Sequence, residues 1–217
     1  SWAGSAPGPQ RRLAWEGSGG EKGRGGRPAA LVAGADAVPG DLSVVALESR
    51  AARYLPSVND SFLRDHPAAA VEEFSCVRQC WQLPARLLFP ADFDAAQEYP
   101  LVLDIHGGPN GRFSASYDLT QQLLCDAGYL VLAVNPRGSS SYGPEFLNAV
   151  LRDWGGEDFL DLMAAVEQVC QRPYVDAHRL GVHGYSYGGF MSRWSLGRDP
   201  RSNAARLGAA CPHPPTP

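Results

Sequence analysis

The arrangement that most constrains the fold is the alternation, from Tyr99 onward, of short apolar runs with longer amphipathic segments. The apolar runs are residues 101–105 (LVLDI), 129–134 (YLVLAV) and 180–183 (LGVH). Nearly continuous apolar runs of this length are typical of strands that are buried on both faces of a sheet. Strands that alternate with helices predict an α/β protein whose parallel sheet carries helices on both faces.

Two of the intervening segments show helical periodicity. Residues 158–170 have apolar side chains at helical spacing, namely Phe159, Leu162, Met163, Val166 and Val169. Residues 117–127 place four apolar side chains on one helical face, namely Leu119, Leu123, Leu124 and Ala127. Gly128 then stands where a C-terminal cap belongs. Both segments are expected to be helices that pack on the sheet.

Composition bounds the rest of the chain. Residues 1–40 hold ten Gly and four Pro without periodicity, which predicts a flexible segment. The net charge of −4 argues against a nucleic-acid binder that relies on a basic surface. No apolar run is long enough to span a membrane, and no apolar signal-peptide region opens the sequence. A cytoplasmic protein that binds neither nucleic acid nor membranes is therefore expected.

The five cysteines show no disulfide framework and indicate free thiols in a reducing compartment. Cys76 and Cys80 have a spacing that some zinc sites use, but no second Cys/His pair follows them. We expect no metal site.

The third apolar run leads into Gly184-Tyr185-Ser186-Tyr187-Gly188, a G-x-S-x-G pattern between a predicted strand and a predicted helix. A sharp turn at such a junction exposes the Ser186 hydroxyl at the carboxyl end of the sheet. The backbone N–H of Tyr187 is then placed to donate to an oxyanion. A glycine-rich turn that contains a structural, non-catalytic serine would show the same sequence pattern.

A second glycine turn, His106-Gly107-Gly108-Pro109, ends the first apolar run. In an α/β-hydrolase the loop at this place supplies the other oxyanion donor, whereas elsewhere the same letters are only a tight turn. The two turns in this order favour an α/β-hydrolase fold.

Four ordered stretches carry a family resemblance: YPLVLDIHGGPNG, GYLVLAVNPRGSSSYG, LRDWGGEDFLDLMAAVE and VDAHRLGVHGYSYGGFMSRW. They resemble the catalytic domain of the prolyl oligopeptidase family of serine peptidases, in its acylaminoacyl-peptidase and dipeptidyl-aminopeptidase-like branch. The resemblance implies a peptide substrate, no cofactor, and an α/β-hydrolase domain behind a β-propeller. Together with the composition, the resemblance predicts three parts. They are a flexible segment (1–40), a propeller remnant with its linker (41–98), and a partial α/β-hydrolase catalytic domain with an incomplete parallel sheet (99–217).

Carried over by position, Ser186 resembles the family's nucleophile, and the N–H groups of Tyr187 and Gly108 resemble its oxyanion hole. Arg137 and Tyr142 lie in a loop that is near the pocket in relatives; alternatively they are a loop tyrosine and a solvated arginine. The chain would form an acyl-enzyme on Ser186 and release an amine.

The base and its orienting acid do not follow Ser186 as this fold requires. His183 is expected to be a packed or hydrogen-bonded strand residue, and His106 to shape its loop. His213 lies among prolines, and Asp199 comes too early for the acid. We therefore expect a catalytic domain truncated at its C-terminus and inactive or nearly so.

Two alternatives stay open. One is an esterase of the same fold, which would cleave aryl esters but not peptide amides. The other is a non-catalytic interaction protein derived from a degenerate hydrolase, against which the intact G-x-S-x-G argues.

Overall fold

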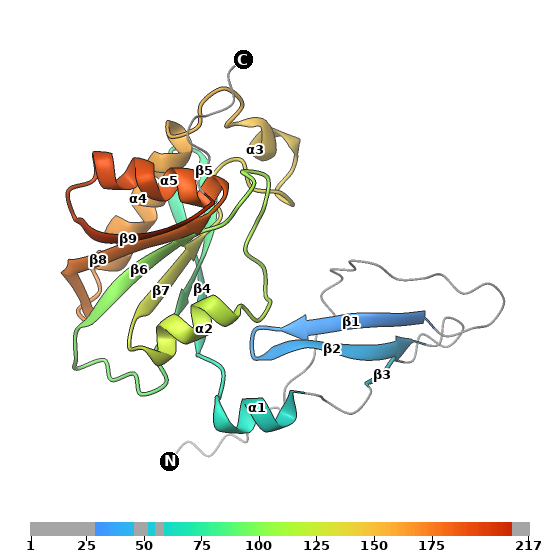
Figure 1. Cartoon of the computed structure of the whole chain (residues 1–217). Helices are drawn as coiled ribbons and strands as arrows, with labels where there is room; N and C mark the ends of the chain where they lie inside the picture. Colours follow the sequence, from blue (N-terminus) through green and yellow to red (C-terminus); the bar gives the residue numbers. More distant parts are fainter. Residues whose placement is uncertain (1–28, 46–51, 55–58, 210–217) are drawn as a thin grey trace, which may run out of the picture. The chain divides into compact units, whose positions relative to one another are not determined.

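The computed structural model describes residues 29–45, 52–54 and 59–209, which form two compact units (Figure 1). The first unit contains the described residues up to Ala68 together with residues 115–118. The second contains residues 69–114 and 119–209. Residues 1–28 of the predicted flexible segment and His213 lie outside the described residues.

The first unit is built on a three-stranded antiparallel sheet in the order β1-β2-β3. Its elements are β1 (Ala29–Ala35), β2 (Val38–Val45), β3 (Ala52–Tyr54) and helix α1 (Asp60–Asp65). The prediction of a flexible segment is therefore wrong for residues 29–40. Gly34 sits at an irregularity in the register of the hairpin, where a Cβ would lie 3.1 Å from the carbonyl oxygen of Val38. This glycine serves a β-bulge rather than flexibility.

The second unit contains a six-stranded mixed sheet in the order β4-β5-β7-β6-β8-β9. Strands β7, β6, β8 and β9 run parallel to one another. Strand β5 pairs antiparallel with β7, and β4 pairs antiparallel with β5. The strands are β4 (Val71–Arg78), β5 (Trp81–Leu88), β6 (Tyr99–Ile105), β7 (Leu130–Val134), β8 (Val175–Tyr185) and β9 (Ser202–Gly208). The helices are α2 (Leu119–Asp126), α3 (Pro144–Asn148), α4 (Glu157–Cys170) and α5 (Tyr187–Arg198). The three predicted strands are confirmed as β6, β7 and β8. The predicted helices are confirmed as α2, α4 and, directly after Ser186, α5.

The boundary predicted at residue 99 differs from the structure. Strands β4 and β5 fall in the range 41–98, yet β5 pairs with β7, with Ala85 opposite Val134. The side chains of Leu83, Ala85 and Leu87 are buried in the main core. The hydrolase sheet therefore begins near residue 71 rather than at 99. The irregular apolar pattern of β5 arises because Leu88 is buried on the other face.

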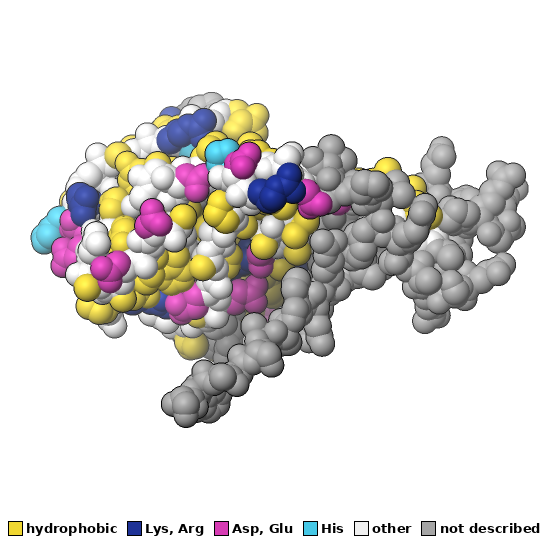
Figure 2. Space-filling view, turned by 90° about the horizontal axis from the view of Figure 1, so that it is seen from below, with side chains coloured by type: hydrophobic (Ala, Val, Ile, Leu, Met, Phe, Trp, Pro, Cys, Tyr) yellow, Lys and Arg dark blue, Asp and Glu magenta, His cyan; other side chains and the backbone are white. Residues whose placement is uncertain are grey.

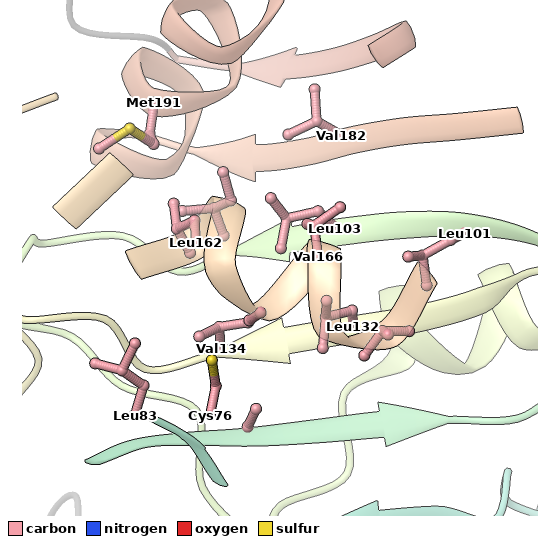
Figure 3. Packing of buried hydrophobic residues seen from close by; sticks show 14 of the residues in the cluster. Cys76, Leu83, Leu101, Leu103, Leu132, Val134, Leu162, Val166, Val182 and Met191 are labelled. Atoms are coloured by element: carbon pink, nitrogen blue, oxygen red, sulfur yellow. The ribbon is translucent and has the colours of Figure 1, made fainter. Parts of the chain in front are cut away.

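Helices α4 and α5 cover one face of the sheet and form the main core with it. Figure 3 shows Leu162 and Val166 of α4 lying over the strands that carry Leu103 and Leu132. Met191 of α5 is also fully buried in this cluster. Burial of a side chain of this size stabilises the fold by about 1.5–3 kcal/mol.

Helix α2 lies on the opposite face. Its Cys125 packs with Val131 and Leu88, and Val131 alternates along β7 with the residues of the main core. The buried Gln121 donates from Nε2 to the carboxylate of Asp104 on β6, at 2.8 Å. The sheet thus has helices on both faces, as predicted.

The face of α2 that packs on the sheet differs from the prediction. Leu119 and Leu123, expected to face the sheet, are 53% and 57% exposed. The buried positions include Gln122, whose Oε1 accepts the N–H of Ala69 at 2.7 Å. Glutamine can be buried here because the sheet and the chain entering β4 offer it hydrogen-bond partners.

Figure 2 shows one face of the molecular surface, on which hydrophobic side chains lie between scattered charged side chains.

Two further observations concern cysteines and membranes. The four cysteines among the described residues, Cys76, Cys80, Cys125 and Cys170, are free thiols, as predicted. Among the helices of the described ranges, none is both long and apolar enough to cross a bilayer.

Candidate active site

Ser186 lies at the sharp turn between β8 and α5. Its backbone has φ 59° and ψ −116°, a left-handed value that costs a non-glycine residue about 1–3 kcal/mol. The Ser186 N–H donates to the carbonyl oxygen of Gly208 on β9 at 2.9 Å, and its own carbonyl accepts the Phe190 N–H at 3.0 Å. The turn is therefore held by the edge strand on one side and by the first turn of α5 on the other.

The glycines of the G-x-S-x-G pattern are required by close backbone contact. A Cβ on Gly184 would overlap the carbonyl oxygen of Gly188, and a Cβ on Gly188 would overlap that of Ile105. Strand, elbow helix and the end of β6 approach one another too closely for any other residue. The spacing of the motif thus follows from packing around the serine.

The second glycine turn comes alongside Ser186. Strands β6 and β8 are parallel neighbours, with Ile105 opposite Gly184, so their carboxyl ends meet at the same edge of the sheet. A Cβ on Gly107 would lie 3.8 Å from the Cβ of Ser186. Gly108, next in the chain, has φ 129°, a value that favours glycine. The structure therefore brings the two turns together, as their place at the strand ends predicts.

His106 belongs to the scaffold of this loop. Its Nδ1 lies 2.8 Å from the carbonyl oxygen of Gly107, and its Nε2 lies 2.9 Å from the hydroxyl of Ser139. Burial lowers the pKa of His106, so the ring is neutral. Since a carbonyl oxygen can only accept, Nδ1 carries the proton. The Ser139 hydroxyl beside Nε2 also donates to the carbonyl oxygen of Pro136 at 2.7 Å. Both ring nitrogens are thus engaged in shaping the loop.

The first turn of α5 points N–H groups at the elbow. Tyr187 is the first residue of this helix, and the first four N–H groups of a helix have no acceptor within it. The N-terminus of a helix also favours negative charge. The Tyr187 N–H next to Ser186 is therefore available to an oxygen that gains charge.

No histidine hydrogen-bonds the Ser186 hydroxyl among the residues that the structure describes. His183 points its Nδ1 at the carboxylate of Asp104 at 2.8 Å, and Arg206 donates to its Nε2 at 2.9 Å. Asp199 binds Arg201 through both carboxylate oxygens, which lowers the pKa of Asp199. Within the described ranges, Ser186 has no base in place.

Arg137 and Tyr142 are held in structural contacts. The Arg137 guanidinium binds Asp161 through Nε and Nη2, at 2.8 and 2.6 Å, and also reaches Glu157 at 2.8 Å. The Tyr142 hydroxyl accepts from Nδ2 of the buried Asn135 at 2.8 Å. Arg137 is buried, so the alternative of a solvated arginine is wrong, and its guanidinium ties its loop to α4.

Sequence reasoning missed Asp158 as a residue of the site. This carboxylate is fully buried and accepts the Tyr187 hydroxyl at 2.5 Å. A signal was present in the D-W-G-G-E-D stretch, where an acidic residue opens an otherwise apolar helical face. Among the described residues no group of three or more His, Cys, Asp or Glu side chains could hold a metal ion.

Comparison with known proteins identifies relatives that are similar in sequence to this α/β-hydrolase unit. Residues 115–210 match the prolyl oligopeptidase family. A Bacillus subtilis protein described as an uncharacterized peptidase, YuxL, is 42% identical over 155 residues, which are 70% of this chain and 24% of that protein. Dipeptidyl-peptidase 5 of Porphyromonas gingivalis is 31% identical over 176 residues, covering 80% of this chain and 26% of the relative.

Solved structures agree on the fold. The acylaminoacyl peptidase of Pyrococcus horikoshii superposes with a TM-score of 0.82 at 24% identity, covering 92% of this chain and 32% of the other. An acylaminoacyl peptidase in complex with Z-Gly-Gly-Phe-chloromethyl ketone gives a TM-score of 0.79 at 25% identity, covering 87% and 30%. The chain spans only about a quarter to a third of the length of these relatives. The serine elbow and the facing glycine turn agree with these likenesses, and the α/β-hydrolase unit, whose residues 115–210 match the family model, belongs to the prolyl oligopeptidase family.

Proposed function

We propose that this chain supplies the nucleophile and oxyanion hole of a serine peptidase that acts on short peptides. Ser186 Oγ attacks the peptide carbonyl carbon and gives its proton to a base. The carbonyl oxygen, now negative, accepts from the N–H groups of Tyr187 and Gly108. The C–N bond then breaks, the amine leaves with the proton, and water later hydrolyses the acyl-enzyme.

The observation that carries the proposal is the strained elbow. Ser186 is held at φ 59°, close backbone contacts require glycine at positions 184 and 188, and a second glycine turn lies beside the serine. A glycine-rich loop with a purely structural serine would not require this combination. Strain of this kind persists only where the surrounding structure fixes it, and it clusters at functional sites.

We further propose that these 217 residues react slowly by themselves, because no described histidine touches the Ser186 hydroxyl. Loss of the base in a serine triad costs on the order of 10⁴–10⁶ in turnover. We also propose that the β1-β2-β3 sheet of the first unit is the remnant of a β-propeller.

Chemical rescue tests the proposal. The chain is incubated with a fluorophosphonate, with and without imidazole as an external base, and labelling is measured by intact mass and peptide mapping. We expect slow labelling that imidazole accelerates, located at Ser186 and abolished by Ser186→Ala. Ser75→Ala, at an exposed serine of β4, is the matched control and should label as the parent does.

Each outcome decides a part of the proposal. Absence of labelling even with imidazole, or labelling that persists in Ser186→Ala, would overturn the assignment of the nucleophile. Fast labelling without imidazole would show that the chain already holds a base. With imidazole present, cleavage of a p-nitrophenyl ester above the rates of imidazole alone and of Ser186→Ala, without cleavage of a p-nitroanilide, would point to an esterase instead.

A further inference from the structure

The residue next to the serine is anchored from inside the protein. The Tyr187 side chain is 1% exposed, and its hydroxyl donates to Oδ2 of Asp158 at 2.5 Å. Burial raises the pKa of Tyr187 well above its ordinary value, so the hydroxyl keeps the proton that it donates. A hydrogen bond to a charged acceptor away from water is among the stronger contacts in a protein.

Asp158 is itself fixed by the turn that precedes α4. Its Oδ1 accepts the N–H groups of Gly155 at 2.9 Å and of Phe159 at 2.8 Å. Gly155 has φ 81°, and a Cβ there would lie 2.7 Å from the Trp194 ring. The Trp194 Nε1 donates to the carbonyl oxygen of Gly155 at 2.8 Å. Because Trp194 belongs to α5, the turn and the elbow helix are locked to each other.

The aromatic ring of Tyr187 is held as firmly as its hydroxyl. Trp154, from the same turn, meets it edge-on with ring centroids 5.1 Å apart. Phe190, one turn further along α5, has its ring centroid 6.4 Å from that of Tyr187 and 6.0 Å from that of Trp154, so the three rings form one cluster. The side chain therefore has one position, and the Cα that carries the backbone N–H is fixed with it.

We propose that Asp158 is a positioning residue for the oxyanion hole: through the Tyr187 side chain it holds the Tyr187 N–H, and the strained elbow before it, in place. The inference rests on the proposed function of that N–H. The elbow is braced at Ser186 by the carbonyl of Gly208 on the N-terminal side. Asp158 supplies the brace on the C-terminal side.

A purely structural role would loosen the whole unit alike, whereas a positioning role loosens the elbow first. Amide hydrogen exchange of the full 217-residue chain separates the two. The Ser186 N–H, bonded to Gly208, reports the elbow, and the N–H of Leu132 in the centre of the sheet reports global opening. Tyr187→Phe removes the hydroxyl and keeps the ring, and Asp158→Asn keeps an uncharged acceptor.

We expect Tyr187→Phe to raise Ser186 exchange about tenfold or more relative to Leu132, since a hydrogen bond to a buried charge is lost. Asp158→Asn should raise the same ratio as well, because only one of its two side-chain ends still accepts, whereas both oxygens of Asp158 accept hydrogen bonds. Tyr129→Phe, at a partly exposed tyrosine, should leave the ratio unchanged.

A second control is Asp161→Asn, which removes an equally buried carboxylate of α4 that binds Arg137 and not the elbow. It should change both amides alike. The same variants are then labelled with the fluorophosphonate in the presence of imidazole. Tyr187→Phe and Asp158→Asn should slow labelling of Ser186 in the order of their exchange ratios.

The outcomes keep the two proposals apart. If Ser186 labels normally in both variants and its exchange ratio does not move, the positioning role is refuted while the nucleophile stands. If the parent chain does not label but the exchange ratio responds, Asp158 holds the elbow and the peptidase proposal fails. A uniform rise at both amides would make Asp158 a stabilising residue only.

Discussion

Replacement of the buried Asp158 by Asn should change how stability depends on pH. Burial raises the pKa of Asp158 from an ordinary 3.8 to about 6, against the opposing effect of its hydrogen bonds from Tyr187, Phe159 and Gly155. The folded state thus binds this proton more tightly than the unfolded state, so ionisation disfavours folding. One unit of pKa corresponds to about 1.4 kcal/mol, which gives roughly 3 kcal/mol for this group.

The pH window follows from these two values. The contribution of Asp158 to stability is complete below about pH 4, falls between pH 4 and 6, and is lost above that range. Asn cannot ionise and lacks this dependence. The free energy of unfolding of Asp158→Asn minus that of the parent should therefore rise by roughly 3 kcal/mol from pH 4 to pH 7.

Urea unfolding at a series of pH values measures this difference, in which the other titrating groups largely cancel. Asp199→Asn provides a contrast of opposite sign. Arg201 lowers the pKa of Asp199, so its stabilisation is present at neutral pH and is lost as the pH falls through the folded-state pKa. Parallel curves for Asp158→Asn and the parent, or a slope with the sign of Asp199→Asn, would refute the reasoning.

Three further predictions test the elbow and the packing. Ser186→Gly should raise the free energy of unfolding by about 1 kcal/mol, because glycine tolerates φ 59°; an unchanged or lower value in thermal unfolding would contradict the strain. Gly188→Ala should prevent labelling of Ser186 and lower the melting temperature, since the methyl group would overlap the carbonyl oxygen of Ile105; a parent-like rate would count against that close approach. Leu162→Ala should cost about 2–5 kcal/mol in urea unfolding, whereas Leu123→Gln, at an exposed site, should stay within about 0.5 kcal/mol; equal effects would mean that the predicted face of α2 is buried after all.

The strands and the longest helix could be predicted because their patterns are local. Residues 101–105 and 129–134 are nearly continuous apolar runs, interrupted only by Asp104, and such runs are typical of strands buried on both faces. Helix α4 repeats its apolar positions for three turns. Strand β9 gave no such signal. Its Arg206 interrupts the apolar run, and it is accommodated because it pairs with His183 across the sheet rather than packing in a core.

The site was predictable in part for the same reason. The G-x-S-x-G and H-G-G letters lie at strand ends, and parallel strands bring their carboxyl ends to one edge, so Ser186 and the loop of Gly107 and Gly108 had to come together. The role of Asp158 could not be predicted, because its partner Tyr187 is 29 residues away and only the packing of α4 against α5 joins them.

Local patterns in the sequence predict the alternation of strands and helices, the elbow serine and the family, because each depends on periodicity or on residues close together in the chain. Tertiary contacts, in contrast, determine which face of α2 is buried, the pairing of β4 and β5 with the hydrolase sheet, and the contact of Asp158 with the elbow tyrosine. These depend on partners brought in from distant segments. Gln121 and Gln122 are buried because Asp104 and the Ala69 N–H meet them, and the helical pattern of α2 contains no trace of either.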